Sequence, residues 1–164
     1  MPYLLLLQAA IGSFPGAICA YFWEKFPNSN IKFIVVESEH APCLIQSAQN
    51  NQMTSVNIKK ETMMAGLSCG EPSLLGWEIL SIGADDFVSI SDQLIPSTMK
   101  MLANNNPPIE AGESSVAGLV ALIEIMKTQD IAKKLELDSD SIVLLFGTEG
   151  ATDPEIYNSI IKSG

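Results

Sequence analysis

The stretch Tyr3-Leu4-Leu5-Leu6-Leu7-Gln8-Ala9-Ala10-Ile11-Gly12-Ser13-Phe14 joins an apolar run to a turn of small residues and then to an amphipathic segment. The apolar run has the length of a buried strand, and Phe14–Phe26 has the spacing of a helix for which Ser13 is the expected N-cap. Backbone N–H groups at a helix N-terminus are unpaired, and the helix dipole favours an anion there. Taken alone, the turn is explained about equally well as a phosphate cradle or as a plain strand-to-helix connection.

The same alternation of strand and helix continues along all 164 residues. It predicts an α/β fold: a mostly parallel sheet with helices on both faces, in three layers αβα. No stretch has the composition of a linker, so we expect residues 1–164 to form a single domain. The predicted strands are Tyr3–Gln8, Ile31–Glu37, Asp86–Ile90 and Ser141–Phe146, the first and last expected to be buried, with a shorter one at Ser55–Ile58. After the first helix, further helices are predicted at Pro42–Asn51, Ser73–Ile82, Asp92–Asn105, Ser115–Lys127, Ile131–Leu135 and Pro154–Ile161.

The composition excludes several classes of partner. A formal net charge of -10 argues against nucleic acid and anionic membranes. All nine basic residues are lysine, so a phosphate site must use backbone N–H groups, hydroxyls or lysine rather than a guanidinium fork. Three widely spaced cysteines do not form a disulfide framework, which favours a reducing cytoplasmic location. No stretch is long enough to span a bilayer.

Two turns are expected at the ligand-binding edge of the sheet. Ligands of open parallel sheets bind at the carboxyl ends of the strands, and Ala9–Ser13 and Gly147–Gly150 both follow predicted strands. The second turn is the more distinctive, because its glycines flank Thr148 and Glu149 and allow a close approach of the backbone. A plain strand-to-helix turn, with Thr152 or Asp153 as the N-cap of the next helix, explains only the second half of the segment from Phe146 to Pro154.

Two other motifs have plain structural interpretations. Gly112-Glu113-Ser114-Ser115 precedes a helix, so Ser114 or Ser115 is the expected N-cap; Glu113 is then either favourable near the helix dipole or a site carboxylate. Glu37, Glu39, His40 and Cys43 follow a strand, and a solvated loop is favoured over a metal site, so no metal ligand is predicted.

No catalytic residue is predicted within the chain. A nucleophilic Cys69 would require the only histidine, His40, from a distant segment, and this pairing is disfavoured. A loop in which Ser73 caps the following helix is the favoured interpretation of the segment around Cys69.

Five segments together resemble one family. QAAIGSF, VVESEHAPCL, MAGLSCGEPSLLGWEIL, AGESSVAGL and LLFGTEGATDPEIY occur in this order from residue 8 to residue 157. They resemble the C-terminal part of the diaminopropionate ammonia-lyases, which are pyridoxal-phosphate enzymes of the tryptophan-synthase-β-like fold, fold type II. The resemblance implies an α,β-elimination that converts 2,3-diaminopropionate to pyruvate and ammonia, with pyridoxal phosphate as the electron sink.

The resemblance also implies the cofactor-binding residues. Ala9, Ala10, Ile11, Gly12 and Ser13 match the phosphate-cradling loop, with Ala10 where the family usually has glycine. Glu113 matches a glutamate near the cofactor ring. Gly147 and Thr148 match the turn that faces the pyridine nitrogen, and which of the two provides the partner is left open.

The family's Schiff-base lysine lies in an N-terminal half that the resemblance does not cover. None of the nine lysines here stands in a small-residue loop facing either turn, so we expect this chain to be inactive alone. The expected partners are an amino-acid substrate, the missing N-terminal half or a partner subunit, and further copies in a homo-oligomer such as a homodimer. The expected role is in amino-acid catabolism. The alternatives are a non-catalytic phosphate-binding or assembly module and a fragment of a threonine-dehydratase-like lyase.

Overall fold

The computed structural model describes residues 3–163 and places four parallel strands in one sheet. The strands are β1 (Tyr3–Gln8), β2 (Ile31–Ser38), β3 (Asp86–Ile90) and β4 (Ile142–Leu145), in the spatial order β3-β2-β1-β4. The register aligns Leu5 of β1 with Phe33 of β2 and Leu144 of β4. The α/β class and the parallel sheet predicted from the sequence are therefore confirmed.

The described part of the chain also contains seven α-helices and two short 3-10 helices, all but the last of them lying between strands. They are α1 (Ser13–Lys25), α2 (Cys43–Asn50), η1 (Ala65–Leu67), α3 (Leu74–Gly83), η2 (Asp92–Leu94), α4 (Ile95–Ala103), α5 (Ala117–Lys127), α6 (Gln129–Lys134) and α7 (Pro154–Lys162). None of the helices described is long and apolar enough to cross a membrane.

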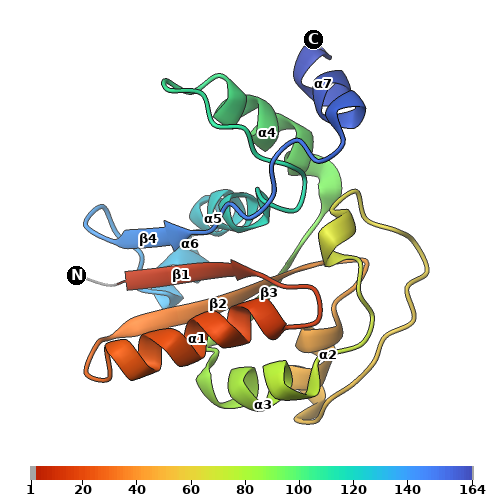
Figure 1. The fold of residues 1–164 in the computed structure, drawn as a ribbon. Helices are drawn as coiled ribbons and strands as arrows, with labels where there is room; N and C mark the ends of the chain where they lie inside the picture. The colour runs from red at the N-terminus through yellow and green to blue at the C-terminus, as the bar shows by residue number, and fades with distance from the viewer. Residues whose placement is uncertain (1–2, 164) are drawn as a thin grey trace.

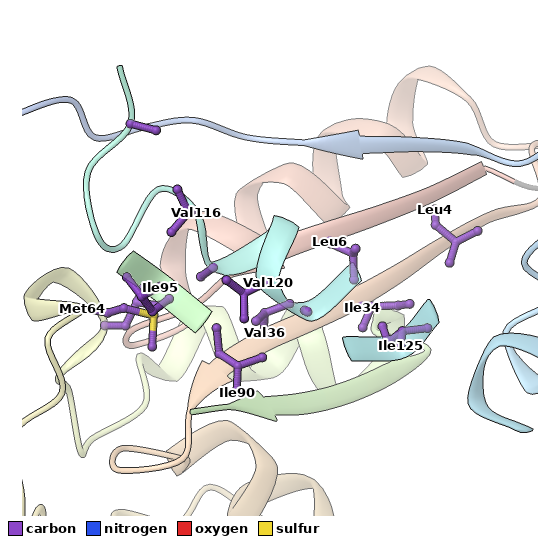
Figure 2. Packing of buried hydrophobic residues seen from close by; sticks show 14 of the residues in the cluster. Leu4, Leu6, Ile34, Val36, Met64, Ile90, Ile95, Val116, Val120 and Ile125 are labelled. Carbon is purple, nitrogen blue, oxygen red and sulfur yellow. The ribbon is translucent and has the colours of Figure 1, made fainter. Parts of the chain in front are cut away.

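Alternate residues of the central strands face opposite layers, as the two-residue period of a strand requires. Leu4 and Leu6 of β1 enter the core on the face covered by α4, α5 and α6. Figure 2 shows the packing of buried residues in this core. Leu5 and Leu7 enter the core on the face covered by α1, α2 and α3. The helices thus cover both faces of the sheet, with α1 and α3 on one side and α5 on the other (Figure 1).

Two sequence-based predictions of secondary structure are wrong. Residues 55–58 form no strand; the one backbone hydrogen bond there joins Val56 N–H to the Gly70 carbonyl. The last strand is not buried, because β4 lies at an edge of the described sheet, with Ile142 46% and Leu144 39% exposed. Its apolar residues are as typical of a central strand as of this edge, so the local pattern could not tell the two apart.

The strand order places a switch point between β1 and β4. From β1 the chain builds outward through β2 to β3, and it then returns to place β4 on the other side of β1. The connections that leave β1 and β4 therefore diverge, and such a divergence opens a crevice at the carboxyl ends of the strands. The two turns singled out in the sequence lie at this crevice.

Candidate cofactor-binding site

A cavity of about 410 Å³ lies at the carboxyl ends of β1 and β4. Residues from four separate segments line it: Gln8, Ala10, Phe14, Gly66, Leu67, Ser114, Thr148, Glu149, Gly150 and Thr152. Two of the predicted cofactor-binding residues, Ala10 and Thr148, are brought to this cavity from opposite ends of the chain. The fold thus gathers in one place the two turns that the sequence separates by well over a hundred residues.

The turn after β1 presents unpaired N–H groups at the start of α1. Within residues 3–163, no backbone N–H from Ala10 to Phe14 donates a hydrogen bond to another residue. Gly12 is the N-cap of α1 and has a φ of 93°, a conformation that favours glycine. The prediction that Ser13 is the N-cap is wrong. Ser13 is the first residue of the helix, and its exposed side chain makes no capping hydrogen bond.

The opening of α1 is held from the side by the start of α3. Ser73 donates its N–H to the Ile11 carbonyl at 2.7 Å and, as predicted, caps α3 by accepting from the Gly76 N–H. Gly76 packs so closely that a Cβ atom there would lie 2.8 Å from the carbonyl carbon of Gly12. The position of the cradle therefore depends on the segment around Ser73.

Gln8 and Phe14 join the turn after β4 to the turn after β1. Gln8 Nε2 donates to the Phe146 carbonyl at 2.7 Å and to Thr148 Oγ1 at 3.1 Å. The rings of Phe14 and Phe146 pack edge to face with centroids 5.6 Å apart. These contacts hold the turn that carries Thr148 against the turn after β1, and both turns line the same cavity.

Glu149 and Ser114 join the remaining walls of the cavity. Glu149 Oε2 accepts from the Ser114 N–H at 2.7 Å, and Ser114 Oγ accepts from the Gly66 N–H at 3.1 Å. The prediction that Ser114 or Ser115 caps α5 is therefore wrong, because Val116 is the N-cap and has no side-chain bond. The Ser114 hydroxyl instead bonds a distant loop, a tertiary contact that the local sequence does not encode.

Glu113 is half-buried and is not among the residues that line the cavity. Glu149 is the carboxylate that lines it. Sequence patterns alone did not assign Glu149, Ser114 or Gln8 to the site. The one signal that could have found Glu149 is its place between Gly147 and Gly150 in the most distinctive turn of the chain.

The other predicted residues surround the cavity without lining it. Ala9 is buried and donates its N–H to the Val36 carbonyl at 2.8 Å. Ile11 is 40% exposed, and Gly147 lies at the surface near Ser115. Ala10 is not among the residues with positive φ, so an alanine causes no backbone strain where the family usually has glycine.

Glu37, in β2, and Cys43, the first residue of α2, are both fully buried, so the prediction of a solvated loop is wrong for these two residues. The Glu37 carboxylate caps α2 by accepting from the N–H groups of Leu44 at 2.9 Å and Ile45 at 2.8 Å. Burial raises the pKa of Glu37 to about 7, against the lowering effect of these two bonds and of the Cys43 thiol. The same thiol lies 3.6 Å from the Ala10 carbonyl, so α2 supports the cradle from below.

No lysine of the described residues lines the cavity. Lys32, the lysine on the sheet, is bound at 2.8 Å by Glu136 near the amino end of β2, away from the site. Within the described part of the chain, no group of three or more His, Cys, Asp or Glu side chains is placed to hold a metal ion.

The lining of the cavity fits a ligand that carries a phosphate or a similar anionic group. The N–H groups of residues 10–14, in the turn and first residues of α1, have no acceptor within residues 3–163, and Ala10 and Phe14 of this run line the cavity. Such N–H groups suit a phosphate without any guanidinium. Two buried polar atoms have no hydrogen-bond partner in residues 3–163: Oε1 of Gln8, which lines the cavity, and Oγ of Ser115, the residue after the lining residue Ser114. Because buried polar atoms are rarely left unpaired, they indicate a site built for a polar ligand.

Comparison with known proteins assigns the family. Residues 4–147 match the family described as pyridoxal-phosphate dependent enzyme. The chain belongs to this family of pyridoxal-phosphate dependent enzymes. The match covers β1 through the start of the turn after β4, and hence reaches both turns at the cavity.

Within the pyridoxal-phosphate dependent enzymes, the chain is similar to diaminopropionate ammonia-lyases. It is 40% identical to the enzyme of Salmonella typhimurium over 100% of this chain and 43% of that protein. A crystal structure of the Escherichia coli enzyme, in complex with an aminoacrylate-PLP azomethine reaction intermediate, superposes with a TM-score of 0.87 at 34% identity. That superposition covers 99% of this chain and 42% of the other, so the chain spans about two fifths of these relatives.

More distant structures share the fold alone. Serine racemase of maize superposes with a TM-score of 0.75 at 19% identity, covering 97% of this chain and 46% of that chain. The fold type II expected from the resemblance is confirmed by the superposition on the Escherichia coli diaminopropionate ammonia-lyase and by the family match.

Proposed function

We propose that this chain is the C-terminal, cofactor-holding part of a pyridoxal-phosphate-dependent diaminopropionate ammonia-lyase. The complete enzyme would convert 2,3-diaminopropionate to pyruvate and ammonia by α,β-elimination. One observation carries the proposal: the open N-terminus of α1 and the Thr148 turn meet at one cavity. The 40% identity to the Salmonella typhimurium enzyme supports this substrate over that of a threonine-dehydratase-like lyase.

In this proposal the backbone N–H groups of residues 10–14 bind the cofactor phosphate, aided by the α1 dipole. Thr148 would donate its hydroxyl hydrogen to the ring nitrogen, and Gly147 is its neighbour in the same turn. Glu149 fixes the Ser114 N–H and so closes the wall of the cavity rather than moving a proton. The bound cofactor supplies an electron sink for the negative charge left at the substrate Cα.

Titration of the purified chain with pyridoxal phosphate, followed by amide NMR, tests the binding part of the proposal. We expect the N–H signals of residues 10–14 to shift, with weaker shifts at the same residues on adding inorganic phosphate. We expect no absorbance band of a Schiff base, because no lysine of the described residues lines the cavity. Shifts confined to backbone N–H signals of segments away from the cavity would contradict the assignment.

The reaction is tested by supplying a lysine-bearing N-terminal half of a diaminopropionate ammonia-lyase to this chain. The reconstituted protein should release ammonia from 2,3-diaminopropionate much faster than from threonine. This chain alone should release none above the rate with free pyridoxal phosphate. A preference for threonine would favour the threonine-dehydratase-like alternative.

We also infer a protein partner, either the missing half or another copy in a homo-oligomer. Large apolar side chains are exposed on the outer helices, including Leu74 (63%), Leu75 (66%) and Ile82 (84%) of α3. Such a surface favours association. A strictly monomeric chain in size-exclusion chromatography at micromolar concentration, unchanged on adding the N-terminal half, would contradict this inference. A cytoplasmic location is supported by the free thiols of Cys19, Cys43 and Cys69.

A further inference from the structure

The side-chain amide of Gln8 makes a contact that neither the motif nor the family assignment explains. Gln8 is the last residue of β1 and is 5% exposed, at a position where the preceding strand residues are apolar. Its Nε2 bridges two acceptors of the turn after β4, the Phe146 carbonyl and Thr148 Oγ1. Burying the polar amide of Gln8 costs desolvation free energy, which an apolar side chain at this position would not cost.

The two acceptors together fix the direction of the hydrogen bonds. A carbonyl oxygen can only accept, so the amide nitrogen of Gln8, and not its oxygen, must face Phe146. The second hydrogen of the same nitrogen then points to Thr148 Oγ1, which accepts at 3.1 Å. The hydroxyl hydrogen of Thr148 is thereby left free for a different acceptor.

Within residues 3–163 the Thr148 hydroxyl donates to no acceptor, and the residue lines the cavity. The ring nitrogen of pyridoxal phosphate is an acceptor when unprotonated. A hydroxyl that already accepts one hydrogen bond is a stronger donor in the next, because bonds in a chain polarise one another.

We propose that Gln8 is a positioning residue that sets the Thr148 hydroxyl as a hydrogen-bond donor to the ring nitrogen of the cofactor. This inference rests on the proposed function and adds a residue that acts through another. It predicts that Gln8 matters for recognition of the ring and not for binding of the phosphate group, which the N–H groups of α1 hold.

The test compares three probes on the purified chain: pyridoxal phosphate, its 1-deaza analogue, in which a C–H replaces the ring nitrogen, and inorganic phosphate. Gln8→Met removes the donor and keeps the length of the side chain. We expect this substitution to lower the affinity for pyridoxal phosphate about tenfold, which corresponds to ~1.4 kcal/mol of binding free energy. The affinities for the 1-deaza analogue and for inorganic phosphate should not change. Gln46→Met is the matched control, since among residues 3–163 the Gln46 side-chain amide bonds only the exposed Gln49.

Thr148→Val should reproduce the loss, and the double variant should lose no more than either single variant, because both act through one hydrogen bond. Thr148→Ser should restore the affinity for pyridoxal phosphate. Equal losses for all three probes would show that Gln8 only maintains the fold and would overturn the inference. Unchanged binding of pyridoxal phosphate by Gln8→Met, or additive losses, would also overturn it. Failure of the unaltered chain to bind pyridoxal phosphate would instead refute the proposed function, and this inference with it.

Discussion

The fully buried carboxyl group of Glu37 makes the stability of this protein depend on pH in a direction opposite to that of most carboxylates. Burial raises its pKa from 4.5 to about 7. Between these two values the folded protein keeps a proton that the unfolded chain has already released. The contribution of Glu37 to the free energy of unfolding is therefore greatest below pH 4.5, falls as pH rises through this interval, and levels off above about pH 7.

The size of the effect follows from the shift. Each pKa unit corresponds to ~1.4 kcal/mol, so the rise from 4.5 to about 7 amounts to about 3 kcal/mol of lost stability. The Cys43 thiol, 3.6 Å from Glu37 Oε1, does not titrate in this interval, because burial raises its pKa to about 12. The carboxyl group of Glu37 alone is thus expected to account for the difference between the protein and a Glu37→Gln variant.

Urea unfolding of the protein and of Glu37→Gln, at several pH values from about 4.5 to about 8, measures this difference. All other titrating groups are shared and cancel in the subtraction. Relative to Glu37→Gln, the unaltered protein should lose about 3 kcal/mol across the interval. A relative stability that rises with pH would refute the reasoning; it would show that the bonds from Leu44 and Ile45 outweigh desolvation.

Three further predictions concern the cradle and its support. Gly76→Ala should cost about 1–3 kcal/mol in urea unfolding by overpacking against Gly12, whereas Gly150→Ala, whose methyl group meets only the Glu110 carboxylate, should cost less. Gly12→Ala should cost about 1–2 kcal/mol from its positive φ and should weaken phosphate binding in an NMR titration; undiminished binding would contradict the assigned cradle. Ser73→Ala should cost about 1 kcal/mol through the lost cap of α3, and an equal loss in the exposed Ser81→Ala would refute that explanation.

The local patterns were enough to predict most of the elements. The apolar runs of β1, β2 and β3, the cap at Ser73 and the cap at Asp153, which accepts from two N–H groups of α7, all follow from neighbouring residues. The predictions that Ser13 and Ser114 cap helices are wrong for two different reasons. Gly12 takes the N-cap position with a positive φ, and Ser114 bonds Gly66 across the cavity.

The candidate site shows the same division. Neighbouring residues were enough to predict the small-residue turn after β1 and the glycine-flanked turn after β4, because turns and helix starts depend on residues close together in the chain. The packing of the folded chain, by contrast, brings these turns together through Gln8, places Glu149 rather than Glu113 at the cavity, and buries Glu37. These outcomes depend on the order β3-β2-β1-β4, which places β4 beside β1. Contacts between segments so far apart in the chain are set by the packing of the whole sheet and leave no local pattern in the sequence.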